Sequence, residues 1–366
     1  MAGPRWTARP ATSAVIAVCT VAYLVAWVGA AVRSDAPLTS LLRGIWNYDD
    51  VELLTALGAL SSVRVWLDHE WWRVASAGLL HGSWLHLGLN MLGLWSVGQW
   101  TEKAWGSWGQ LAVFTIASIG GCAASLAWAE APMVVGASAG IFGLAGGLVV
   151  ARQFGSSDTQ AAVGPVSAKT LAFWLVFWLV VGAVLPVLFG ISLLAQAGHI
   201  GGLVFGSLAG LALSISPKRR GARIGLWSGV AVGLAGVFAL SAAPTWRANY
   251  HVFLGSELLE RGDFSTAATH FDEALERAGG PAADPSLANA VAYALAEAGV
   301  DLGRAETLVR AALAEDPDNA DYLDTLGWAL CQNGRVDEGR DALEQAKAAS
   351  DRDIPEIDEH LSRCGQ

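Results

Sequence analysis

The stretch VVGASAGIFGLAGG, from Val134 to Gly147, places one serine in an apolar run that is rich in glycine and alanine. Its first half contains Gly136-Ala137-Ser138-Ala139-Gly140, which fits the G-x-S-x-G pattern around the nucleophile of many hydrolases. Its second half is typical of a membrane helix, in which small residues let two helices touch. Taken alone, the pattern favours helix packing over catalysis, so the role of Ser138 depends on partners elsewhere in the chain.

Composition divides the 366-residue chain into two parts. Hydrophobic residues make up 53% of the chain and charged residues 15%, which is too apolar for an ordinary soluble protein of this size. Residues 1–245 carry 13 Lys and Arg against 9 Asp and Glu, a net charge of +4, whereas residues 246–366 carry 10 against 24, a net charge of −14. We therefore expect a transmembrane domain over 1–245 and an acidic water-soluble domain over 246–366. The few, scattered basic residues do not indicate nucleic-acid binding.

Seven apolar segments match the length that a helix needs to cross a bilayer core about 30 Å thick. They are residues 11–32, 84–100, 108–128, 135–154, 170–189, 194–215 and 224–243. The first follows two arginines and could be a signal peptide, but its length favours a retained helix. The sequence thus predicts an all-α fold: a polytopic transmembrane helical bundle followed by a soluble helical domain.

Basic residues orient this bundle, because they gather in alternate loops and such loops face the cytoplasm. These residues are Arg5, Arg9, Lys103, Arg152, Lys169, Lys218, Arg219, Arg220 and Arg223. The opposite side holds a long acidic loop with Asp35, Asp49, Asp50, Glu52, Asp68 and Glu70. We expect a multi-pass protein of a bacterial plasma membrane with a cytoplasmic N-terminus. Seven crossings put the C-terminal domain outside, and one span fewer would bring it inside.

The acidic tail repeats itself at separations of 38 and then 34 residues. The matching sets are Gly255, Tyr293 and Gly327; Ala267, Ala305 and Gly339; Phe271, Val309 and Leu343; and Ala274, Ala312 and Ala346. The period of 34, with small residues where paired helices touch, resembles the tetratricopeptide repeat (TPR). We expect about three TPR-like repeats over 248–349, stacked into an α-solenoid that binds a peptide or a partner protein.

The four cysteines show no C-x-x-C spacing. Cys19 and Cys122 fall in apolar spans and are interpreted as small hydrophobic residues. Cys331 and Cys364 could pair if their domain faces an oxidising space, which the sequence leaves open. The chain also lacks a zinc-binding pattern, so we expect no metal and no cofactor.

Three polar clusters in the transmembrane part are candidates for chemistry. The first is HGSWLHLGLNML, with His81, His86 and Asn90; the second is Ser138; the third is His199, in QAGHIGGLVFG. His86 and Asn90 are four residues apart and so share a helical face. The predicted topology puts all three clusters toward the outer ends of their spans, so we expect them to converge.

Such a convergence would assemble the parts of an acyl-transfer site. A neutral imidazole, here that of His199, can take the proton of a serine hydroxyl. His86, the Asn90 amide and the backbone N–H of Ser138 are available as donors to an oxyanion. The nearby acids, Glu130 and Asp158, are not placed to orient the histidine. We therefore predict a Ser–His dyad.

Glycine spacing indicates that the two spans can approach closely enough. Gly136, Gly140 and Gly143 line one span, and Gly202, Gly206 and Gly210 line the other at four-residue spacing. Small residues at this spacing allow close contact between membrane helices.

With these pieces in order, the chain resembles the rhomboid family of intramembrane serine proteases over residues 71–210. The matching pieces are Trp72-Arg73, the His81…His86…Asn90 series, Gly98…Glu102-Lys103…Gly106, Gly136-Ala137-Ser138 and His199…Gly202…Gly206. The resemblance implies a six-helix core with an added seventh helix, and cleavage of transmembrane protein substrates near the outer face of the lipid membrane.

The resemblance also implies roles for individual residues. Ser138 matches the family's nucleophile and His199 its base, His86 and Asn90 match the oxyanion-side residues, and His81 matches a structural residue. Two positions depart from the family pattern: Ala139 stands where glycine is usual, and Phe142 where a tyrosine often stacks on the histidine.

Two other classes of function stay open at this stage. A non-catalytic rhomboid-like protein could bind membrane clients with its repeats as a scaffold, but such relatives typically lack the dyad. A transporter would be expected to show internal membrane repeats or coupled charges, which we do not find in the sequence.

Overall fold

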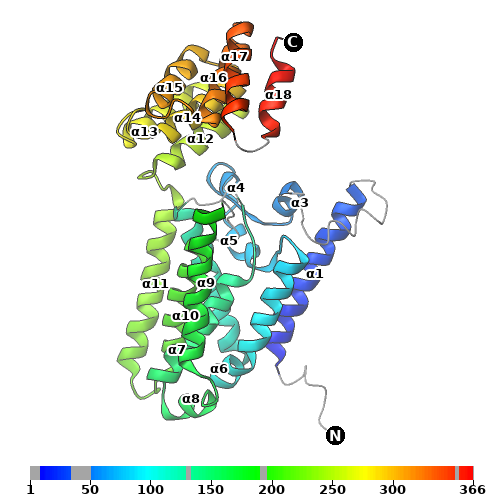
Figure 1. Cartoon of the computed structure of the whole chain (residues 1–366). Helices are drawn as coiled ribbons and strands as arrows, with labels where there is room; N and C mark the ends of the chain where they lie inside the picture. Colours follow the sequence, from blue (N-terminus) through cyan, green and yellow to red (C-terminus); the bar gives the residue numbers. More distant parts are fainter. Residues whose placement is uncertain (1–8, 34–50, 129–132, 190–195, 351–353, 366) are drawn as a thin grey trace. The chain divides into compact units, whose positions relative to one another are not determined.

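The computed structural model describes residues 9–33, 51–128, 133–189, 196–350 and 354–365 (Figure 1). Several residues used in the sequence predictions lie outside these ranges: Arg5, Asp35, Asp49, Asp50, Glu130 and the first two residues of the span 194–215. The chain divides into two compact units, Met1–Ala243 and Pro244–Gln366, which we call the membrane unit and the C-terminal unit. This division lies two residues before the predicted domain boundary at 245.

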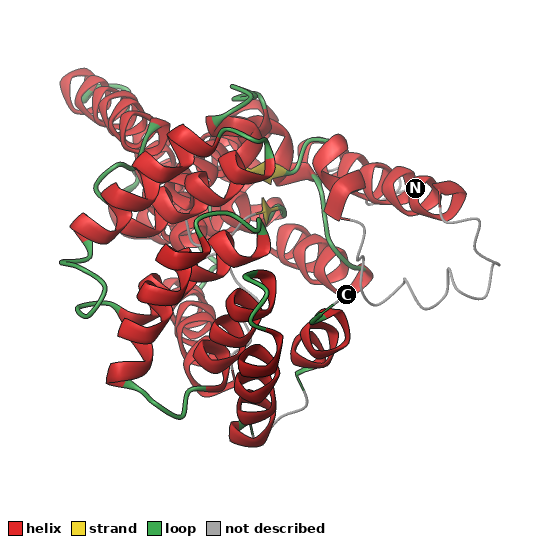
Figure 2. Cartoon of the chain, turned by 90° about the horizontal axis from the view of Figure 1, so that it is seen from above, coloured by secondary structure: helices red, strands yellow, loops and turns green. Residues whose placement is uncertain are grey.

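In the part that the structure describes, the membrane unit is a bundle of helices with one pair of short strands (Figure 2). Its elements are α1 (Pro10–Arg33), α3 (Val51–Ala56), β1 (Leu60–Ser61), α4 (Ser62–Trp66), α5 (Arg73–Ser76), η2 (Ala77–Leu79), α6 (Trp84–Trp128), β2 (Met133–Val134), α7 (Ser138–Phe154), α8 (Ser157–Ala162), α9 (Ala168–Phe189), α10 (Gln196–Ser214) and α11 (Arg220–Ala242). The predicted all-α fold is therefore confirmed for the described residues, apart from the β1–β2 pair.

Four helices among the described residues are long and apolar enough to cross a membrane. They are Pro10–Ala30, Trp84–Trp128, Gln196–Ser214 and Arg220–Ala242, and two shorter apolar helices cover Ser138–Phe154 and Ala168–Val184. The 45-residue α6 contains one non-helical residue, Gly106, with φ 70° and ψ 172°. This kink separates two helical halves, each of a length suited to one crossing.

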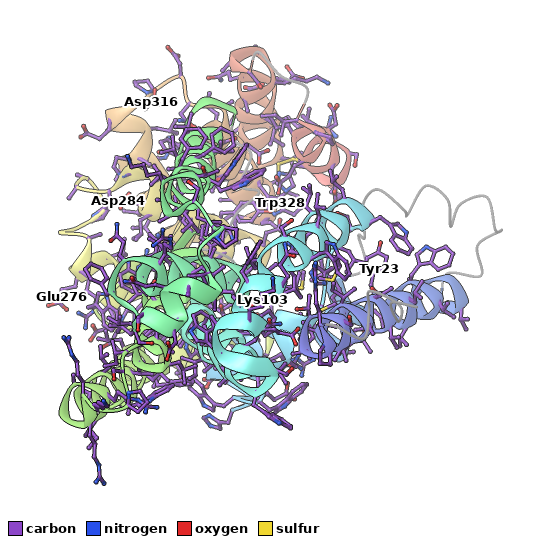
Figure 3. All side chains as sticks on the ribbon, turned by 90° about the horizontal axis from the view of Figure 1, so that it is seen from below. Tyr23, Lys103, Glu276, Asp284, Asp316 and Trp328 are labelled. Atoms are coloured by element: carbon purple, nitrogen blue, oxygen red, sulfur yellow. A yellow bond between two sulfur atoms is a disulfide. The ribbon has the colours of Figure 1, made fainter. Side chains whose placement is uncertain are left out.

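The motif Gly98…Glu102…Gly106 holds α1 against α6. The Glu102 carboxylate accepts hydrogen bonds from Thr12 N at 2.9 Å and from Thr12 Oγ1 at 2.7 Å, in the first turn of α1. An acidic group near a helix N-terminus is stabilised by the unpaired N–H groups there. A Cβ on Gly98 would lie 2.3 Å from Thr12 Oγ1, so only glycine fits here without a shift. Farther along α1, Tyr23 (Figure 3) packs its ring 4.5 Å from that of Trp84.

Helices α7 and α10 contact each other through glycine. A Cβ on Gly202 would lie 2.3 Å from Ala139 O, and one on Gly206 would lie 2.2 Å from Gly143 Cα. The two backbones are therefore in direct contact along this seam, as small residues permit in membrane helices. This contact fixes the positions of the first turns of α7 and α10 relative to each other.

In its described residues, 244–350 and 354–365, the C-terminal unit forms three helical hairpins and one further helix. The hairpins are α12 (Ala248–Glu260) with α13 (Phe264–Arg277), α14 (Pro285–Glu297) with α15 (Leu302–Glu315), and α16 (Ala320–Gln332) with α17 (Val336–Ala349), followed by α18 (Pro355–Arg363). Acidic or amide side chains cap three of the helices: Asp263 accepts from Thr266 N, Asp284 from Leu287 N, and Asn319 from Tyr322 N. Such caps satisfy backbone donors that a helix leaves unpaired.

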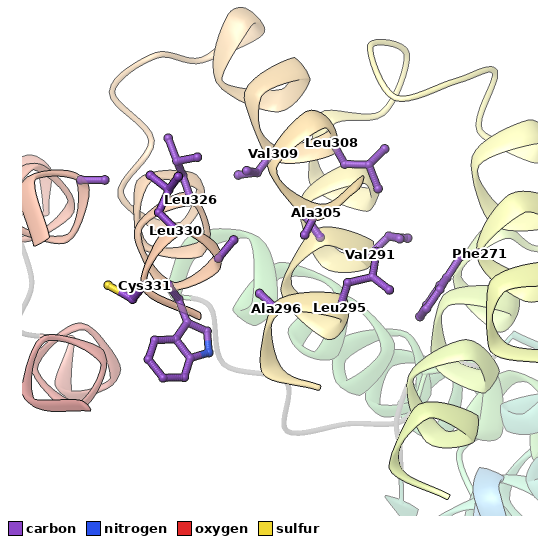
Figure 4. Close-up of a cluster of buried hydrophobic side chains, with 14 of the residues drawn as sticks. Phe271, Val291, Leu295, Ala296, Ala305, Leu308, Val309, Leu326, Leu330 and Cys331 are labelled. Atoms are coloured by element: carbon purple, nitrogen blue, oxygen red, sulfur yellow. The ribbon is translucent and has the colours of Figure 1, made fainter. Parts of the chain in front are cut away.

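The core of this unit is built by side chains from successive hairpins (Figure 4). Phe271, Val309 and Leu343, which the sequence repeat aligns with one another, are all fully buried. A Cβ on Gly255 would lie 2.5 Å from the Phe271 ring, so the small residue lets the first hairpin close. Each hairpin buries its apolar face against its neighbour, as in stacked helical repeats.

Helix α18 is attached to α16 by a disulfide and by a buried ion pair. Cys331 and Cys364 are bonded, with their Cα atoms 5.2 Å apart, which settles the pairing that the sequence leaves open. His360 Nδ1 lies 2.9 Å from Asp324 Oδ1, and the His360 ring stacks on Trp328 (Figure 3) with centroids 4.6 Å apart. His360 is only 2% exposed, so this polar side chain belongs to the interior of the unit and not to its surface.

Candidate active site

Ser138 and His199 meet at one end of the glycine seam. Ser138 is the first residue of α7 and His199 is the fourth residue of α10, and Ser138 Oγ lies 2.8 Å from His199 Nε2. The imidazole is 3% exposed and stacks on the Phe142 ring, with centroids 4.5 Å apart and planes 7° from parallel. Phe142 follows Ser138 by one turn of α7, so one helix supplies both contacts to the imidazole.

The surroundings of His199 Nδ1, the other ring nitrogen, show whether a third residue orients the imidazole. His199 Nδ1 is buried and has no hydrogen-bond partner among the described residues. The described part of the chain therefore offers a two-residue arrangement, without a carboxylate to orient the imidazole. The stack on Phe142 is the contact that holds the plane of the ring.

A tight turn brings Ser138 into place at the N-terminus of α7. Gly136 has a φ of 125°, in the region that favours glycine, and its N–H donates to Ala77 O at 3.0 Å. Just before it, β2 pairs antiparallel with β1, with Val134 opposite Leu60. These strands were not predicted from the sequence, although the short β-branched run before Gly136 is a weak signal for one.

The first turn of α7 also supplies hydrogen-bond donors. The first N–H groups of any helix lack intrahelical acceptors and carry a partial positive charge. Ser138 occupies the first helical position after the N-cap residue Ala137, so its own N–H belongs to this set. The nucleophile candidate and an oxyanion donor therefore lie on the same residue.

A cavity of about 50 Å³ surrounds the serine and is large enough to hold water. It is lined by Ala77, His86, Gly121, Cys122, Ser125, Val134, Val135, Gly136, Ser138, Ala139, Gly198 and His199. A Cβ on Gly136 would lie 2.8 Å from His86 Nε2, so glycine at this position gives the His86 ring access to the cavity. The sequence did not indicate that Cys122, interpreted as a small hydrophobic residue, or Ser125 would line this cavity, because both fall in an apolar span without any motif.

Asn90 and His81 do not line the cavity, but both contact His86, which does. The Asn90 side chain is buried and donates from Nδ2 to His86 O at 2.9 Å, within its own helix, and it does not line the cavity. His81 is 1% exposed, and its ring lies edge-on to that of His86 with centroids 5.1 Å apart. Both residues therefore contact His86 and not Ser138: Asn90 bonds to the His86 backbone, and His81 packs against the His86 ring.

Trp72 directly precedes α5 and Arg73 begins it, and neither residue lines the cavity. Arg73 is 3% exposed, donates to Ala59 O at 3.0 Å and to Thr55 O, and pairs with Glu70. Trp72 is exposed, and the Arg73 guanidinium lies 4.7 Å from its ring centroid. The buried Arg73 therefore connects α5 to a carbonyl of α3 and to the carbonyl that precedes β1.

Comparisons with known proteins cover this same part of the chain. Residues 68–216 match the family described as the Rhomboid domain. The chain is 28% identical over 280 residues to "Rhomboid protease GluP" of Bacillus subtilis, which covers 75% of this chain and 51% of that protein. This alignment is longer than the matched domain.

Two shorter similarities agree with this match. The chain is 34% identical over 143 residues to "Rhomboid protease GlpG" of Photorhabdus laumondii, covering 39% of this chain and 47% of that protein. It is 33% identical over 164 residues to "RHOMBOID-like protein 4" of Arabidopsis thaliana, covering 45% and 39%. The chain thus spans about half or less of the length of these relatives. Residues 68–216 of this integral membrane protein are thus similar to the Rhomboid domain, and the relatives named above carry rhomboid names.

Proposed function

We propose that this protein is an intramembrane serine endopeptidase in which Ser138 is the nucleophile and His199 the general base. The observation that carries the proposal is the 2.8 Å distance between Ser138 Oγ and His199 Nε2. A serine hydroxyl is a weak nucleophile until a base within hydrogen-bond reach can accept its proton. The names of the relatives GluP and GlpG, both described as rhomboid proteases, support the same reaction.

The proposed reaction has two steps. Ser138 Oγ attacks the carbonyl carbon of a peptide bond while its proton moves to His199 Nε2 and then to the leaving amine, which leaves an acyl-enzyme. A water molecule then attacks the ester, its proton passes through His199 to Ser138 Oγ, and the new carboxyl end departs. The oxyanion of each step would accept from the backbone N–H of Ser138 and from the His86 ring, and one such donor is worth about 10²–10³ in rate.

The substrates proposed are transmembrane proteins that are cut near the outer membrane face. The carbonyl groups of an intact helix are hydrogen-bonded and shielded from attack, so a substrate helix has to unwind locally. Glycine and proline weaken a helix for known reasons, and we expect such residues or other small ones near the cut.

The C-terminal unit is proposed to be a TPR-like domain on the outer side of the membrane that binds a peptide or a partner protein. Its three hairpins and the burial of the repeated positions support the repeat assignment. Seven crossings from a cytoplasmic N-terminus lead to the outer side. The bond between Cys331 and Cys364 supports this location, because structural disulfides persist in oxidising compartments.

The test is cleavage of single-span membrane proteins co-expressed with the chain. We expect products with the native chain and none with Ser138→Ala or His199→Ala. Ser96→Ala is the matched control, because this serine is exposed on α6 and bonds only to Leu92 O of its own helix. Cleavage that persists in both site variants would refute the assignment of the dyad.

A further inference from the structure

A groove of about 880 Å³ lies in the C-terminal unit, and no residue used in the proposed cleavage lines it. The first helix of each hairpin (α12, α14 and α16) and the segment around α18 form its walls. Its lining includes Phe264, Asn289, Ile357 and five acidic residues. The groove thus draws on all three hairpins, which gives it the length for an extended ligand.

The charge of this lining has one sign. Five carboxylates line the groove, and none of its lining residues is Lys, Arg or His: the five are Glu260, Glu297, Asp321, Asp324 and Glu356. Within the described part of the unit, neither Glu260 nor Asp321 has an ion-pair partner. His360 does not line the groove, but it pairs with Asp324 and lies 3.4 Å from Glu297. The negative charge of Glu260 and Asp321 is therefore the part that no described residue balances.

The uncharged residues of the groove can contact the apolar side chains and the backbone of a peptide. Apolar side chains of α12, α13 and α18 line the groove, and among them Phe264 is 54% exposed although it is a large hydrophobic residue. Asn289 Oδ1 is buried and has no hydrogen-bond partner in the described structure, so it can accept from a backbone N–H. Apolar contacts, an unused acceptor and carboxylates occur side by side along one groove.

We propose that this groove binds an extended segment of a partner protein in which Lys or Arg residues alternate with apolar ones. Charge complementarity favours a cationic segment, because the groove is lined by carboxylates and by no basic residue, and because Glu260 and Asp321 have no described ion-pair partner. The apolar side chains of the segment pack beside Phe264 and Ile357, and its backbone donates to Asn289. The inference rests on the interaction role proposed for the C-terminal unit but not on peptide-bond cleavage.

The test measures binding with the full chain in detergent, carrying Ser138→Ala so that cleavage cannot contribute. The probe is a fluorescein-labelled peptide of alternating Lys and Val, and its anisotropy is followed at 0.1 M salt with empty micelles as the blank. A peptide with Glu in place of Lys and one with Gln are measured in parallel. We expect the Lys peptide to bind at least about tenfold more tightly than the Gln peptide, and the Glu peptide not to bind.

Two charge-matched variants separate the groove from the general acidity of the unit. The groove variant is Glu260→Gln/Glu297→Gln/Asp321→Asn. The control variant is Glu276→Gln/Glu315→Gln/Asp337→Asn, which removes the same three charges from exposed residues outside the groove; Figure 3 labels Glu276. We expect the groove variant to weaken binding of the Lys peptide about tenfold and the control to change it less than about twofold.

Three results would overturn the inference. Equal losses in both variants would mean that only overall charge attracts the peptide. Equal binding of the Lys and Gln peptides would mean that charge does not select the ligand. Self-association of the chain that the groove variant abolishes would identify a second copy as the occupant. Because Ser138→Ala is present throughout, a failure of the proposed protease function leaves this measurement unaffected.

Discussion

Ser138 Oγ and His199 Nε2 lie 2.8 Å apart although 61 residues separate them in the chain. They meet because Ser138 begins α7 and His199 lies in the first turn of α10, and the two helices are in backbone contact below them through Gly143 and Gly206. The pair is therefore positioned by the helix packing itself. Because the two side chains contact each other directly, we expect the effects of changing either one to depend on the other.

The first prediction concerns this interdependence. If Ser138 and His199 act as a unit, each single alanine variant should lose at least about 10³-fold in cleavage rate, and the double variant should be no slower than either. The measurement is the initial rate of cleavage of a reporter substrate by purified protein. Multiplicative losses in the double variant would show that the two residues act independently.

The second prediction concerns the ring that stacks on His199. Phe142→Leu keeps the apolar volume but removes the parallel stack seen at 4.5 Å. Aromatic pairs are worth about 0.5–1.5 kcal/mol, so a lost stack that leaves the imidazole free to turn should slow cleavage by up to about tenfold. Phe142→Tyr is the control, since it keeps the ring. A Leu variant with the native rate would mean that the stack does not orient His199.

Much of this site can be predicted from the sequence because helix geometry is regular. The order of the motifs and the direction of each span place Ser138, His199 and His86 at one end of the bundle, and the structure brings these three to one cavity. The four-residue spacing of glycines similarly indicates the seam between α7 and α10. Both inferences use the period of the helix and need no knowledge of loops.

Other features depend on contacts that no local pattern specifies. The β1–β2 pair joins residues 60–61 to 133–134, and each strand has only two residues, too few to give an alternating pattern. The inward turn of the Asn90 amide to His86 O is a rotamer choice, so it could not be foreseen. Glu102 belongs to the family motif, but its hydrogen bond to Thr12 could be predicted only if the position of α1 were known. The burial of His360 likewise requires the docking of α18.

The third prediction tests the glycine seam. Gly206→Ala would put a Cβ 2.2 Å from Gly143 Cα, which the two backbones can accommodate only by moving apart. Overpacking of this kind costs about 1–3 kcal/mol, and it should also separate Ser138 from His199. We expect a lower melting temperature in detergent and a lower cleavage rate.

Gly229→Ala is the matched control for this change. Gly229 lies on α11, and a Cβ there would have no atom within 4 Å among the described residues. The substitution is the same, in a helix of the same unit, so its melting temperature and rate should match the native protein. Equal effects of the two substitutions would show that helix propensity, and not the seam, is responsible.

The fourth prediction concerns the disulfide that ties α18 to α16. Cys331 and Cys364 are 33 residues apart, and closing a loop of this size stabilises a fold by about 3 kcal/mol. Cys331→Ser/Cys364→Ser should therefore speed hydrogen exchange in α18, as measured by mass spectrometry of the full chain. A reducing agent should have the same effect on the native chain and none on the variant. Unchanged exchange in the variant would show that the other contacts of α18 suffice.

The fifth prediction concerns pH and the buried pair of His360 and Asp324. Burial lowers the pKa of His360, but its hydrogen bond to Asp324 and the charge of that carboxylate raise it. The charges of Glu297 and Glu356 act in the same direction, and the pKa of His360 lies above its usual value of 6.5. The folded state thus binds this proton more tightly than the unfolded chain does.

The sign of the pH effect follows from this shift. The stabilisation by protonated His360 is fully present below about pH 6.5, the pKa of the unfolded chain, and is lost as the pH rises through the higher pKa of the folded state. His270 has the opposite shift, because burial and the nearby His251 lower its pKa, so a global melting curve would mix the two effects. Hydrogen exchange in α18, expressed as protection factors corrected for the intrinsic rate, isolates the contribution of His360. Protection in α18 should fall with rising pH in the native chain and stay level in His360→Gln; a fall of equal size in that variant would assign the effect to another group.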